Sequence, residues 1–457
     1  MVLSSVTYTR GVTTESGAIR TSESRLDRVG WSALRYAPYR LFLGSMLSFS
    51  SGGFVMFSAL GWYVLQLTGS AAAVGVAFSA YGLPALLLTA HAGVFTDRLG
   101  SRRMLVISLT GIAGIAAVLA LVAASGSPPY LLIVALAFVL GIAQAIGTPA
   151  SVAIVSDLVP APALSSAVTL NFLHMNAARI VGGVIGGTLL AATSPAVGFA
   201  AVALLSAAPA VALGRLPVVL HAAGDRDRPR SSLMGPLVEA FRYAIAHPTL
   251  GVLIVLAIAP GTIGLGYIFV LPLAAEELGI GAGGLGALLV VSGIGGMLAG
   301  LSLEAAHRRV GHGRGVIGGL AGAAISMAAF GLAPGVPLAM LALVVVGGSI
   351  LTYAASSVTL IQALAPPRLR GRMVSLFAML YWGMMPVGSL LTGFVAEATT
   401  ARTTVFLCGV GLGVTGLVAF VIRPQLATLA VARDGRTLTG NLVGSGAEHG
   451  RGGVRDG

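Results

Sequence analysis

Residues 93–103 read Gly-Val-Phe-Thr-Asp-Arg-Leu-Gly-Ser-Arg-Arg, a short charged segment between two long apolar runs. Each flanking run is long enough to cross a bilayer, which takes about 20 mostly apolar residues. The segment holds one acid, Asp97, and three arginines, and its two glycines let helices and backbone approach closely. This pattern is typical of a compact connection between two membrane-spanning helices.

The composition of the whole chain also points to the membrane. Of the 457 residues, 56% are apolar and 9% are charged, and the mean hydropathy is +0.93. So little polar material cannot cover a soluble globule of this length. Lipid must therefore act as the solvent, and helices pair every backbone polar group inside it.

Apolar stretches broken by charges or by Gly/Pro clusters predict an all-α membrane protein with twelve transmembrane helices. Six spans are expected in the first half, near 40–66, 72–95, 104–124, 131–155, 166–192 and 196–216. Six more are expected near 249–274, 283–303, 316–333, 336–362, 373–396 and 401–422.

The charges predict the orientation, because arginine is retained in cytoplasmic loops. Every basic residue is arginine, and the arginines gather in alternate loops, whereas the other loops carry Glu276, Glu277 and Glu397. Both termini are therefore expected in the cytoplasm. The net charge of +12 is spread loop by loop without a basic stripe, so no nucleic-acid partner is expected.

An internal repeat predicts two pseudo-symmetric six-helix bundles. Gly93-x3-Asp97 with Arg102-Arg103 recurs about 207 residues later as Gly300-x3-Glu304 with Arg308-Arg309. The expected domains are a disordered cytoplasmic tail at 1–39, a bundle at 40–216, a cytoplasmic linker with an amphipathic helix at 217–248, a second bundle at 249–422 and a disordered cytoplasmic tail at 423–457. Like-oriented halves place a substrate at mid-depth between them.

The charged segment and its repeat also suggest a mechanical role. An acid can sit against the positive N-terminal end of a neighbouring helix, while arginines hold the inner surface. We predict a conformational latch that closes when the protein faces outward, with topology anchoring as the alternative. The latch residues are Gly93, Asp97, Arg98, Gly100, Arg102, Arg103, Glu304 and Arg308.

These motifs resemble a known family. The spacing Gly93-x3-Asp97-Arg98-x-Gly100-x-Arg102-Arg103 resembles the loop between the second and third helices of major facilitator superfamily transporters. Segments 90–93, 176–182, 370–376 and 381–388 resemble bacterial exporters related to the enterobactin exporter and macrolide efflux proteins, a likeness that spans roughly residues 35–422. The resemblance implies proton antiport, although Gly183 stands where the antiporter signature of the fifth helix has proline.

Arg179 is the most unusual residue in the predicted spans. An arginine near the bilayer centre costs around 2.5 to 3.5 kcal/mol on insertion scales, so Arg179 should face a wet cavity. It shares a broad helical face with Asn171, His174, Gly182 and Gly186. Two interpretations stay open: a contact for anionic or polar substrate groups, or a buried strut bonded to carbonyls.

Further polar and aromatic residues are predicted to line the cavity or to support transport. The cavity candidates are Gln144, Asn171, His174, Arg179, Tyr353, Tyr381 and Trp382. His174 and Asp157 are the candidates for proton coupling, because no Asp or Glu lies deep in a predicted span and histidine titrates near neutrality. A lone histidine can equally be a packing residue, and the substrate can carry the proton itself. Gly182, Gly183, Gly186 and Gly187 are expected to pack helices closely.

Enzymatic functions fit the sequence poorly. The chain has no lysine and hence no phosphate-binding Gly-x4-Gly-Lys segment, its seven histidines are scattered, and its single cysteine, Cys408, lies in an apolar span. We therefore expect a monomeric secondary active transporter of the bacterial plasma membrane, without metal or cofactor. It is expected to export a small amphipathic molecule, such as a drug, macrolide or siderophore-like metabolite, against protons. An uptake permease of the same fold, and a non-transporting membrane receptor or assembly factor, are the alternatives.

Overall fold

The computed structural model describes residues 31–216, 234–431 and 437–439, and these residues form helices almost throughout. Twelve helical segments are long and apolar enough to cross a membrane, which confirms the predicted number. Ala, Leu, Val and Ile fill these segments, and positive-φ glycines such as Gly69 (φ 64°) end them.

The first bundle contains six continuous helices, which pack against one another. They are α1 (Ala37–Thr68), α2 (Ala71–Leu99), α3 (Ser101–Ala124), α4 (Tyr130–Leu158), α5 (Leu164–Ala192) and α6 (Pro195–Gly214). The short helices η2 (Ser32–Arg35) and η3 (Ala161–Ala163) flank α1 and α5.

The second bundle also spans the membrane six times, but two of its spans are interrupted. The spans are α8 (Pro248–Leu256) with η4 (Pro260–Gly264) and α9 (Tyr267–Glu277), α10 (Gly281–Val310), α11 (His312–Gly331), α12 (Val336–Leu364), α13 (Arg370–Trp382) with α14 (Met385–Ala398), and α15 (Ala401–Ile422). Proline lacks the N–H that continues a helix, and Pro260 and Pro386 stand at the two breaks. The broken regions touch, because η4 packs against α13 and α14.

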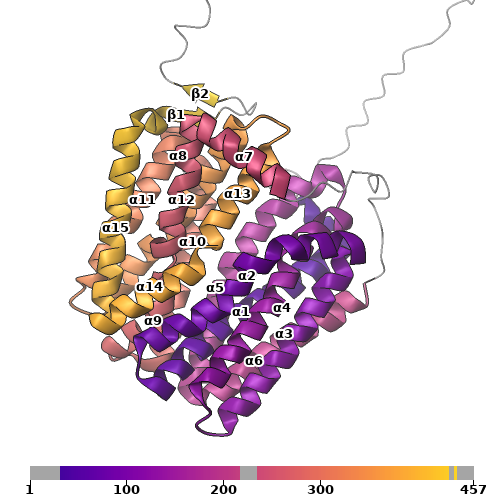
Figure 1. Ribbon diagram of the computed structural model, residues 1–457, viewed down its shortest axis with the longest axis vertical. Coiled ribbons are helices and arrows are strands. Elements are labelled where there is room, and N and C mark those ends of the chain that lie inside the picture. The colour runs from indigo at the N-terminus through magenta and orange to yellow at the C-terminus, as the bar shows by residue number, and fades with distance from the viewer. Residues whose placement is uncertain (1–30, 217–233, 432–436, 440–457) are drawn as a thin grey trace, which may run out of the picture.

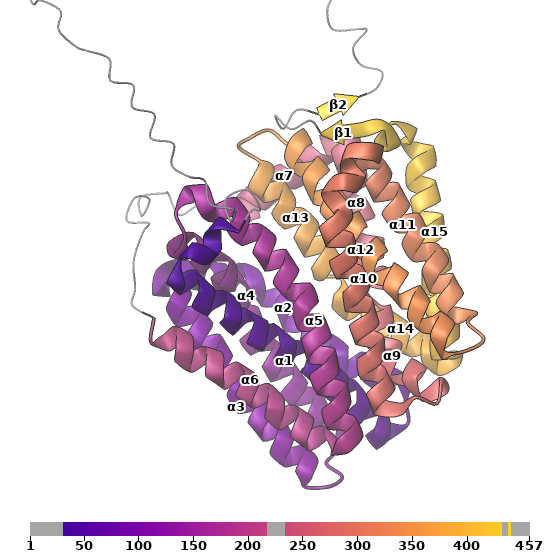
Figure 2. The ribbon, with the colours of Figure 1, turned by 180° about the vertical axis from the view of Figure 1, so that it is seen from behind.

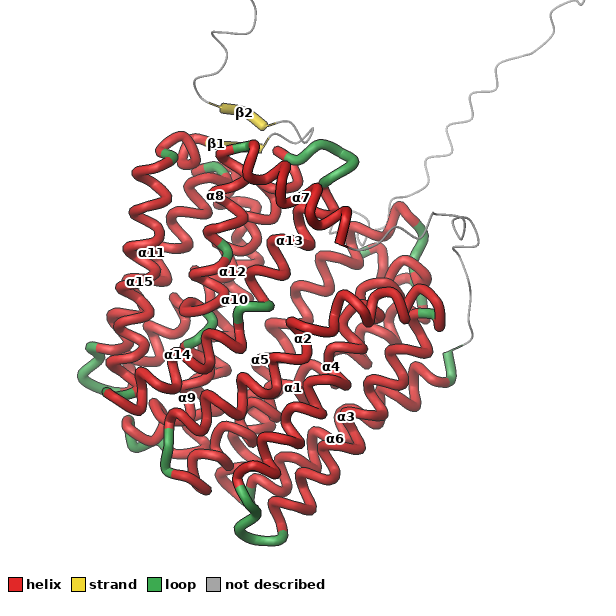
Figure 3. The backbone as a smooth tube through the Cα atoms, in the orientation of Figure 1, coloured by secondary structure: helices red, strands yellow, loops and turns green. Residues whose placement is uncertain are grey.

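The two bundles stand side by side and meet along two helix pairs, α2 with α14 and α5 with α10 (Figures 1 and 2). We call the end where α1 begins and α15 ends the arginine-rich face, because it carries Arg98, Arg102, Arg308 and Arg309. The opposite end, with Glu276, Glu277 and Glu397, is the glutamate-bearing face. Figure 3 shows short loops at both ends of the tightly packed helices.

The linker helix α7 (Met234–Ala246) lies at the arginine-rich face and packs against α8 and α13. Ala240 and Ala244 are buried at 0% and 2% exposure, and Glu239 pairs with Arg368 and Arg372 of the second bundle. The predicted amphipathic helix is present from Met234, and linker residues 217–233 lie outside the described part of the chain.

Two expectations from the sequence need correction, namely the loop at 93–103 and the boundaries of the tails. The predicted loop at 93–103 is almost entirely helical, since α2 runs to Leu99 and α3 starts at Ser101, with Gly100 (φ 88°) as the only residue between them. Glycine accepts this positive φ without strain, so one residue turns the chain. In the repeat of this segment in the second bundle, the residue that turns the chain is Gly311 (φ 83°). Arg308 and Arg309 therefore lie at the end of α10, whereas Arg102 and Arg103 lie at the start of α3.

Described helices and strands extend past the boundaries that were expected for both tails. After α15 the chain forms η5 (Pro424–Thr428) and a hairpin in which β1 (Leu429–Val431) pairs antiparallel with β2 (Thr437–Thr439). Leu426 and Leu429 are buried at 1% and 5% exposure, and this burial holds the segment against α11. At the other end, α1 starts within the expected tail. Residues 1–30, 432–436 and 440–457 lie outside the described residues.

Candidate functional site

Arg179 of α5 lies where the two bundles meet. Its Nη1 donates a hydrogen bond to Ser292 Oγ of α10 at 3.3 Å. Its guanidinium carbon lies 5.3 Å from the centre of the Phe54 ring of α1, within cation–π range. The side chain therefore contacts both bundles at once, and it is half-buried.

Ser292 links Arg179 to a tyrosine in the interrupted seventh span. The hydroxyls of Tyr267 and Ser292 are hydrogen-bonded at 2.7 Å, and each residue is 1% exposed. The Tyr381 hydroxyl lies close enough to both Arg179 and Tyr267 to interact with them electrostatically. Arg179, Ser292, Tyr267 and Tyr381 form what we call the Arg179 cluster. Ser292 and Tyr267 were not predicted from the sequence, because a serine or tyrosine in an apolar span carries no spacing signal.

No described carboxylate forms an ion pair with the Arg179 cluster. Among the described residues, side-chain ion pairs involve Arg308, Arg368 and Arg372, all at the arginine-rich face. The Nε of Arg179 is buried and has no hydrogen-bond partner among the described residues. A guanidinium presents five donors in a planar fork that fits carboxylates and phosphates. The cluster thus offers unused donors to an anionic group.

His174 lies about one and a half turns before Arg179 on α5, inside the first bundle. It is 9% exposed, and its Nε2 lies 3.3 Å from Ser50 Oγ of α1. Asn171, one turn earlier, is half-buried. Asp157, the other proton-coupling candidate, lies near the end of α4 at the arginine-rich face, where its carboxylate accepts a hydrogen bond from Ser101 at 2.9 Å.

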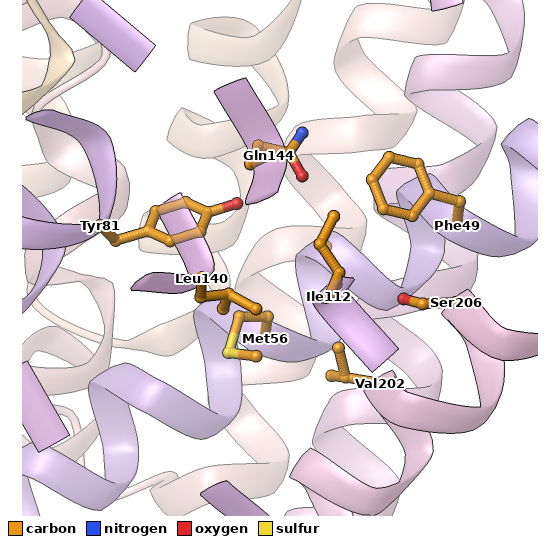
Figure 4. Close-up of a pocket in the computed structure, with 9 residues that line it drawn as sticks. Phe49, Met56, Tyr81, Ile112, Leu140, Gln144, Val202 and Ser206 are labelled. Atoms are coloured by element: carbon orange, nitrogen blue, oxygen red, sulfur yellow. The ribbon is translucent and has the colours of Figure 1, made fainter. Parts of the chain in front are cut away.

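Gln144 lines a small cavity within the first bundle (Figure 4), and no residue of the Arg179 cluster lines this cavity. The cavity measures about 20 Å³, and Tyr81 and Ser206 also border it. Ser206 is 1% exposed, and its hydroxyl has no hydrogen-bond partner among the described residues. A space of this size fits about one water molecule. It is too small for an organic substrate.

The remaining cavity candidates form an aromatic group in the second bundle. Tyr353 and Tyr381 are buried, with ring centres 6.2 Å apart, and Phe377 stacks on Tyr381 at 5.6 Å. Trp382 is 52% exposed and meets Tyr381 edge-on at 5.1 Å. Tyr381 therefore joins this aromatic group to Arg179.

An aromatic contact between the bundles was not predicted. Phe269 of α9 lies 5.9 Å from Phe57 of α1 and 5.1 Å from Phe78 of α2, measured between ring centres. Such pairs add about 0.5–1.5 kcal/mol beyond the burial of area. A phenylalanine within an apolar run can equally face lipid, so its sequence position does not reveal this contact.

The four predicted packing glycines serve two different contacts of α5. Gly182 and Gly186 face α1, where an added Cβ would lie 2.7 Å from the Phe54 Cβ and 3.2 Å from the Ser58 Cβ. Gly183 and Gly187 face α10 instead, and a Cβ on Gly187 would lie 2.7 Å from the Gly286 Cα. One pair thus packs the first bundle internally, while the other brings the two bundles together.

The latch residues make contacts within their own bundles in this conformation. Arg102 donates to the Leu213 carbonyl at 2.9 Å and to the Gly214 carbonyl, and Arg308 pairs with Glu304 at 3.4 Å. Asp97 is exposed and forms no ion pair with a described residue. Arg98 and Arg103 are also exposed, and space is open around Gly93 and Gly100.

The arginine-rich face of the second bundle also carries an open hollow. It measures about 340 Å³ and lies between the end of α12 and the start of α13. Gln362, Arg370, Gly371 and Val374 line it. A guanidinium at this position places positive charge beside a space large enough for a small molecule.

Twelve spans in two bundles, with an uncompensated arginine between them, define a membrane transporter of the major facilitator type. Residues 28–454 match the model of the family described as transmembrane secretion effectors. The chain belongs to this family of the major facilitator superfamily. It is thus a multi-pass membrane transporter and not an enzyme, which leaves no support for a non-transporting receptor.

Two bacterial relatives are an efflux pump and a transporter by name. The chain is 27% identical over 403 residues to the multidrug efflux pump Tap of Mycolicibacterium fortuitum, covering 86% of this chain and 98% of the pump. It is 28% identical over 153 residues to the staphyloferrin A transporter of Staphylococcus aureus, covering 33% and 38% of the two chains.

Solved structures show the same fold at low sequence identity. The nucleoside transporter NupG matches with a TM-score of 0.68 at 16% identity, over 84% of this chain and 99% of NupG. A bacterial homologue of the human lysosomal transporter Spinster, in an inward-facing and unoccupied conformation, matches with a TM-score of 0.67 at 16% identity, over 84% and 97% of the two chains.

Proposed function

We propose that the protein exports a small amphipathic molecule with an anionic or neutral polar group, by alternating access and proton antiport. The Arg179 cluster carries this proposal, because a guanidinium that has no carboxylate partner among the described residues is costly at the junction of both bundles, and its buried Nε leaves a donor for an anionic group. The full-length likeness to a multidrug efflux pump supports export. Drugs, macrolides and siderophore-like metabolites are the substrate classes that we propose.

The proposed orientation places the arginine-rich face and both termini in the cytoplasm of a bacterium. This assignment follows from the retention of arginine in cytoplasmic loops. With this orientation the close contacts of Gly187 with Gly286 and of Gly393 with Gly75 lie toward the outer ends of their helices, and we propose that this conformation faces inward. The hollow beside Arg370 would then open toward the cytoplasm.

Proton coupling is proposed through His174. This histidine is the titratable side chain closest to Arg179 along α5, and it is buried within the first bundle. Asp157 is the second candidate, but it lies at the arginine-rich face and is bonded within its own bundle. The protein is proposed to act as a monomer.

The direction of transport is tested with inside-out vesicles from a host that lacks its own efflux pumps. An accumulation panel in that host first identifies a transported acidic amphiphile. We expect the inside-out vesicles to take up this compound when their lumen is acidic, as an antiporter that exports from the cell requires. Accumulation in right-side-out vesicles with an acidic exterior would instead establish the alternative, an uptake permease.

The role of Arg179 is tested with Arg179→Gln in proteoliposomes. Two forms of the transported amphiphile are compared, the free carboxylate and its methyl ester. We expect at least a tenfold loss of transport of the acid, since a charge-assisted bond is worth more than 1.4 kcal/mol, with the ester changed less than about twofold. Arg309→Gln, at an exposed arginine of α10, is the control. Equal losses for acid and ester would refute anion recognition by Arg179.

A further inference from the structure

A glutamate at the end of α14 reaches across to the other bundle. The Oε2 of Glu397 accepts a hydrogen bond from Ser70 Oγ at 3.0 Å and another from the Ala72 backbone N–H at 3.1 Å. Ser70 is the N-cap of α2, and its Oγ also accepts from the Ala73 N–H at 3.1 Å. We call this contact between α14 and the start of α2 the Glu397 clasp.

The clasp is favourable because of where it lies on α2. The first N–H groups of a helix have no partner within the helix, and the N-terminus carries partial positive charge. A carboxylate that accepts these donors makes charge-assisted bonds, which are stronger than neutral ones. The groups that act on the Glu397 carboxylate are the Ser70 hydroxyl and the amides of Ala71 and Ala72, so its partners come from the opposite bundle.

The clasp closes the outer end of a seam between the bundles. One turn before Glu397, Gly393 packs so closely on α2 that an added Cβ would lie 2.8 Å from the Gly75 Cα and 3.0 Å from the Ala71 carbonyl oxygen. A Cβ on Gly75 would in turn lie 2.5 Å from the Ser389 carbonyl oxygen. Backbones this close cannot separate at the glutamate-bearing face while Glu397 still holds the start of α2.

We propose that Glu397 holds the glutamate-bearing face closed by capping α2 across the bundle interface, and that transport requires this clasp to break. Glu397 is exposed to water, so its carboxylate can exchange its hydrogen bonds to α2 for hydrogen bonds to water at a small cost in free energy. A contact of this strength shifts the balance between the open and closed faces without locking either. Glu397 is therefore a positioning residue of the transport cycle, distinct from the Arg179 cluster that we propose binds substrate.

Glu277 provides a matched control within one bundle. It lies at the end of α9 and accepts hydrogen bonds from the Ala401 N–H at 2.5 Å and the Arg402 N–H at 3.1 Å, which begin α15. The chemistry is the same as in the clasp, a carboxylate on a helix N-terminus at the same face. Both helices belong to the second bundle, so rocking of the bundles leaves this contact intact.

The test measures the opening of the glutamate-bearing face directly. Spin labels are placed at Ser127→Cys in the α3–α4 connection and Leu332→Cys in the α11–α12 connection, both exposed, in a Cys408→Ala background. Distances between the labels are recorded for the full chain in nanodiscs. Neither substrate nor a proton gradient is needed, so the result is independent of the proposed export function.

Glu397→Gln keeps the shape of the side chain and removes its charge. We expect it to raise the ratio of open to closed label distances about five- to tenfold. Ser70→Ala, which removes one of the two donors, is expected to raise the ratio less, and Glu277→Gln is expected to leave it unchanged. The proposal is overturned if Glu397→Gln and Ser70→Ala both match the unsubstituted protein, or if Glu277→Gln opens the face as much as Glu397→Gln does.

Discussion

Arg179 differs from other arginines of this protein in what it binds. Arg102 and Arg402 donate to backbone carbonyls at helix ends, at Leu213 and Ala333, and so satisfy groups that the helix leaves unpaired. Arg179 donates to the hydroxyl of Ser292, which is also bonded to Tyr267. Among the described residues the hydrogen-bonding and cation–π partners of Arg179 are thus a hydroxyl and an aromatic ring, not the carbonyls of one sequence interpretation. A contact with substrate is our proposal.

The proposed proton coupling through His174 predicts different outcomes for substitutions at His174 and at Asp157. His174→Asn should abolish accumulation driven by a pH gradient, because the buried titratable group is lost, while substrate exchange at equal concentrations persists at about the original rate. Asp157→Asn should retain gradient-driven transport, since Asp157 bonds Ser101 at the arginine-rich face. The measurement is uptake into proteoliposomes with and without the gradient. Gradient-driven uptake by His174→Asn would instead indicate a packing role.

At the scale of elements, α5 belongs to one bundle but packs against both. Its glycines alternate between two directions, with Gly182 and Gly186 toward α1 and Gly183 and Gly187 toward α10. Small residues allow such close backbone contact between membrane helices, where apolar burial gives no advantage over lipid. The spacing of the glycines predicted close packing. It did not predict which pair faces the partner bundle.

The α5–α10 contact predicts a specific effect of a single methyl group. Gly286→Ala places a Cβ 2.5 Å from the Gly187 Cα, so the bundles cannot close fully at the glutamate-bearing face. We expect transport to fall at least tenfold although the protein still inserts and folds. Gly318→Ala, at a glycine of α11 with open space around it, controls for the roughly 1 kcal/mol by which alanine favours a helix. Initial transport rates at matched protein levels give the answer, and normal transport by Gly286→Ala would show that the contact is not needed.

At the scale of the whole molecule, the two bundles contact one another through α2 with α14 and α5 with α10. The latch residues with described contacts bond within their own bundles, and Asp97 forms no ion pair with a described residue. This arrangement agrees with the proposal that the latch forms when the arginine-rich face closes. The Glu397 clasp and the latch would then act alternately at opposite faces.

The latch predicts a substitution that slows transport without destabilising this conformation. Asp97→Asn should change the free energy of unfolding by less than about 0.5 kcal/mol, because Asp97 is exposed and unpaired among the described residues. Transport should fall severalfold, since the conformation closed at the arginine-rich face loses its carboxylate. Thermal unfolding in nanodiscs and transport in proteoliposomes are compared, with Glu276→Gln as the control at the other face. Undiminished transport by Asp97→Asn would indicate that segment 93–103 only anchors the topology and does not act as a latch.

The predicted spans lie close to the observed helices because length and apolar character are properties of each segment alone. A hydrocarbon layer of fixed thickness demands about 20 apolar residues per crossing, wherever the segment later packs. The breaks at Pro260 and Pro386 and the single-residue turn at Gly100 depend instead on local backbone geometry. Proline and glycine are visible in the sequence, but many of them stand inside continuous helices.

The sequence by itself determined the membrane class, the twelve crossings and the family, because composition and short spaced motifs act through local chemistry. Only the tertiary structure decided that Arg179 meets Ser292 and that Glu397 meets the start of α2, since these partners lie 113 and more than 300 residues apart. A side chain on a lipid-solvated helix can point to lipid, to its own bundle or to the other bundle. The packing of two bundles selects among these, and no single span contains that information.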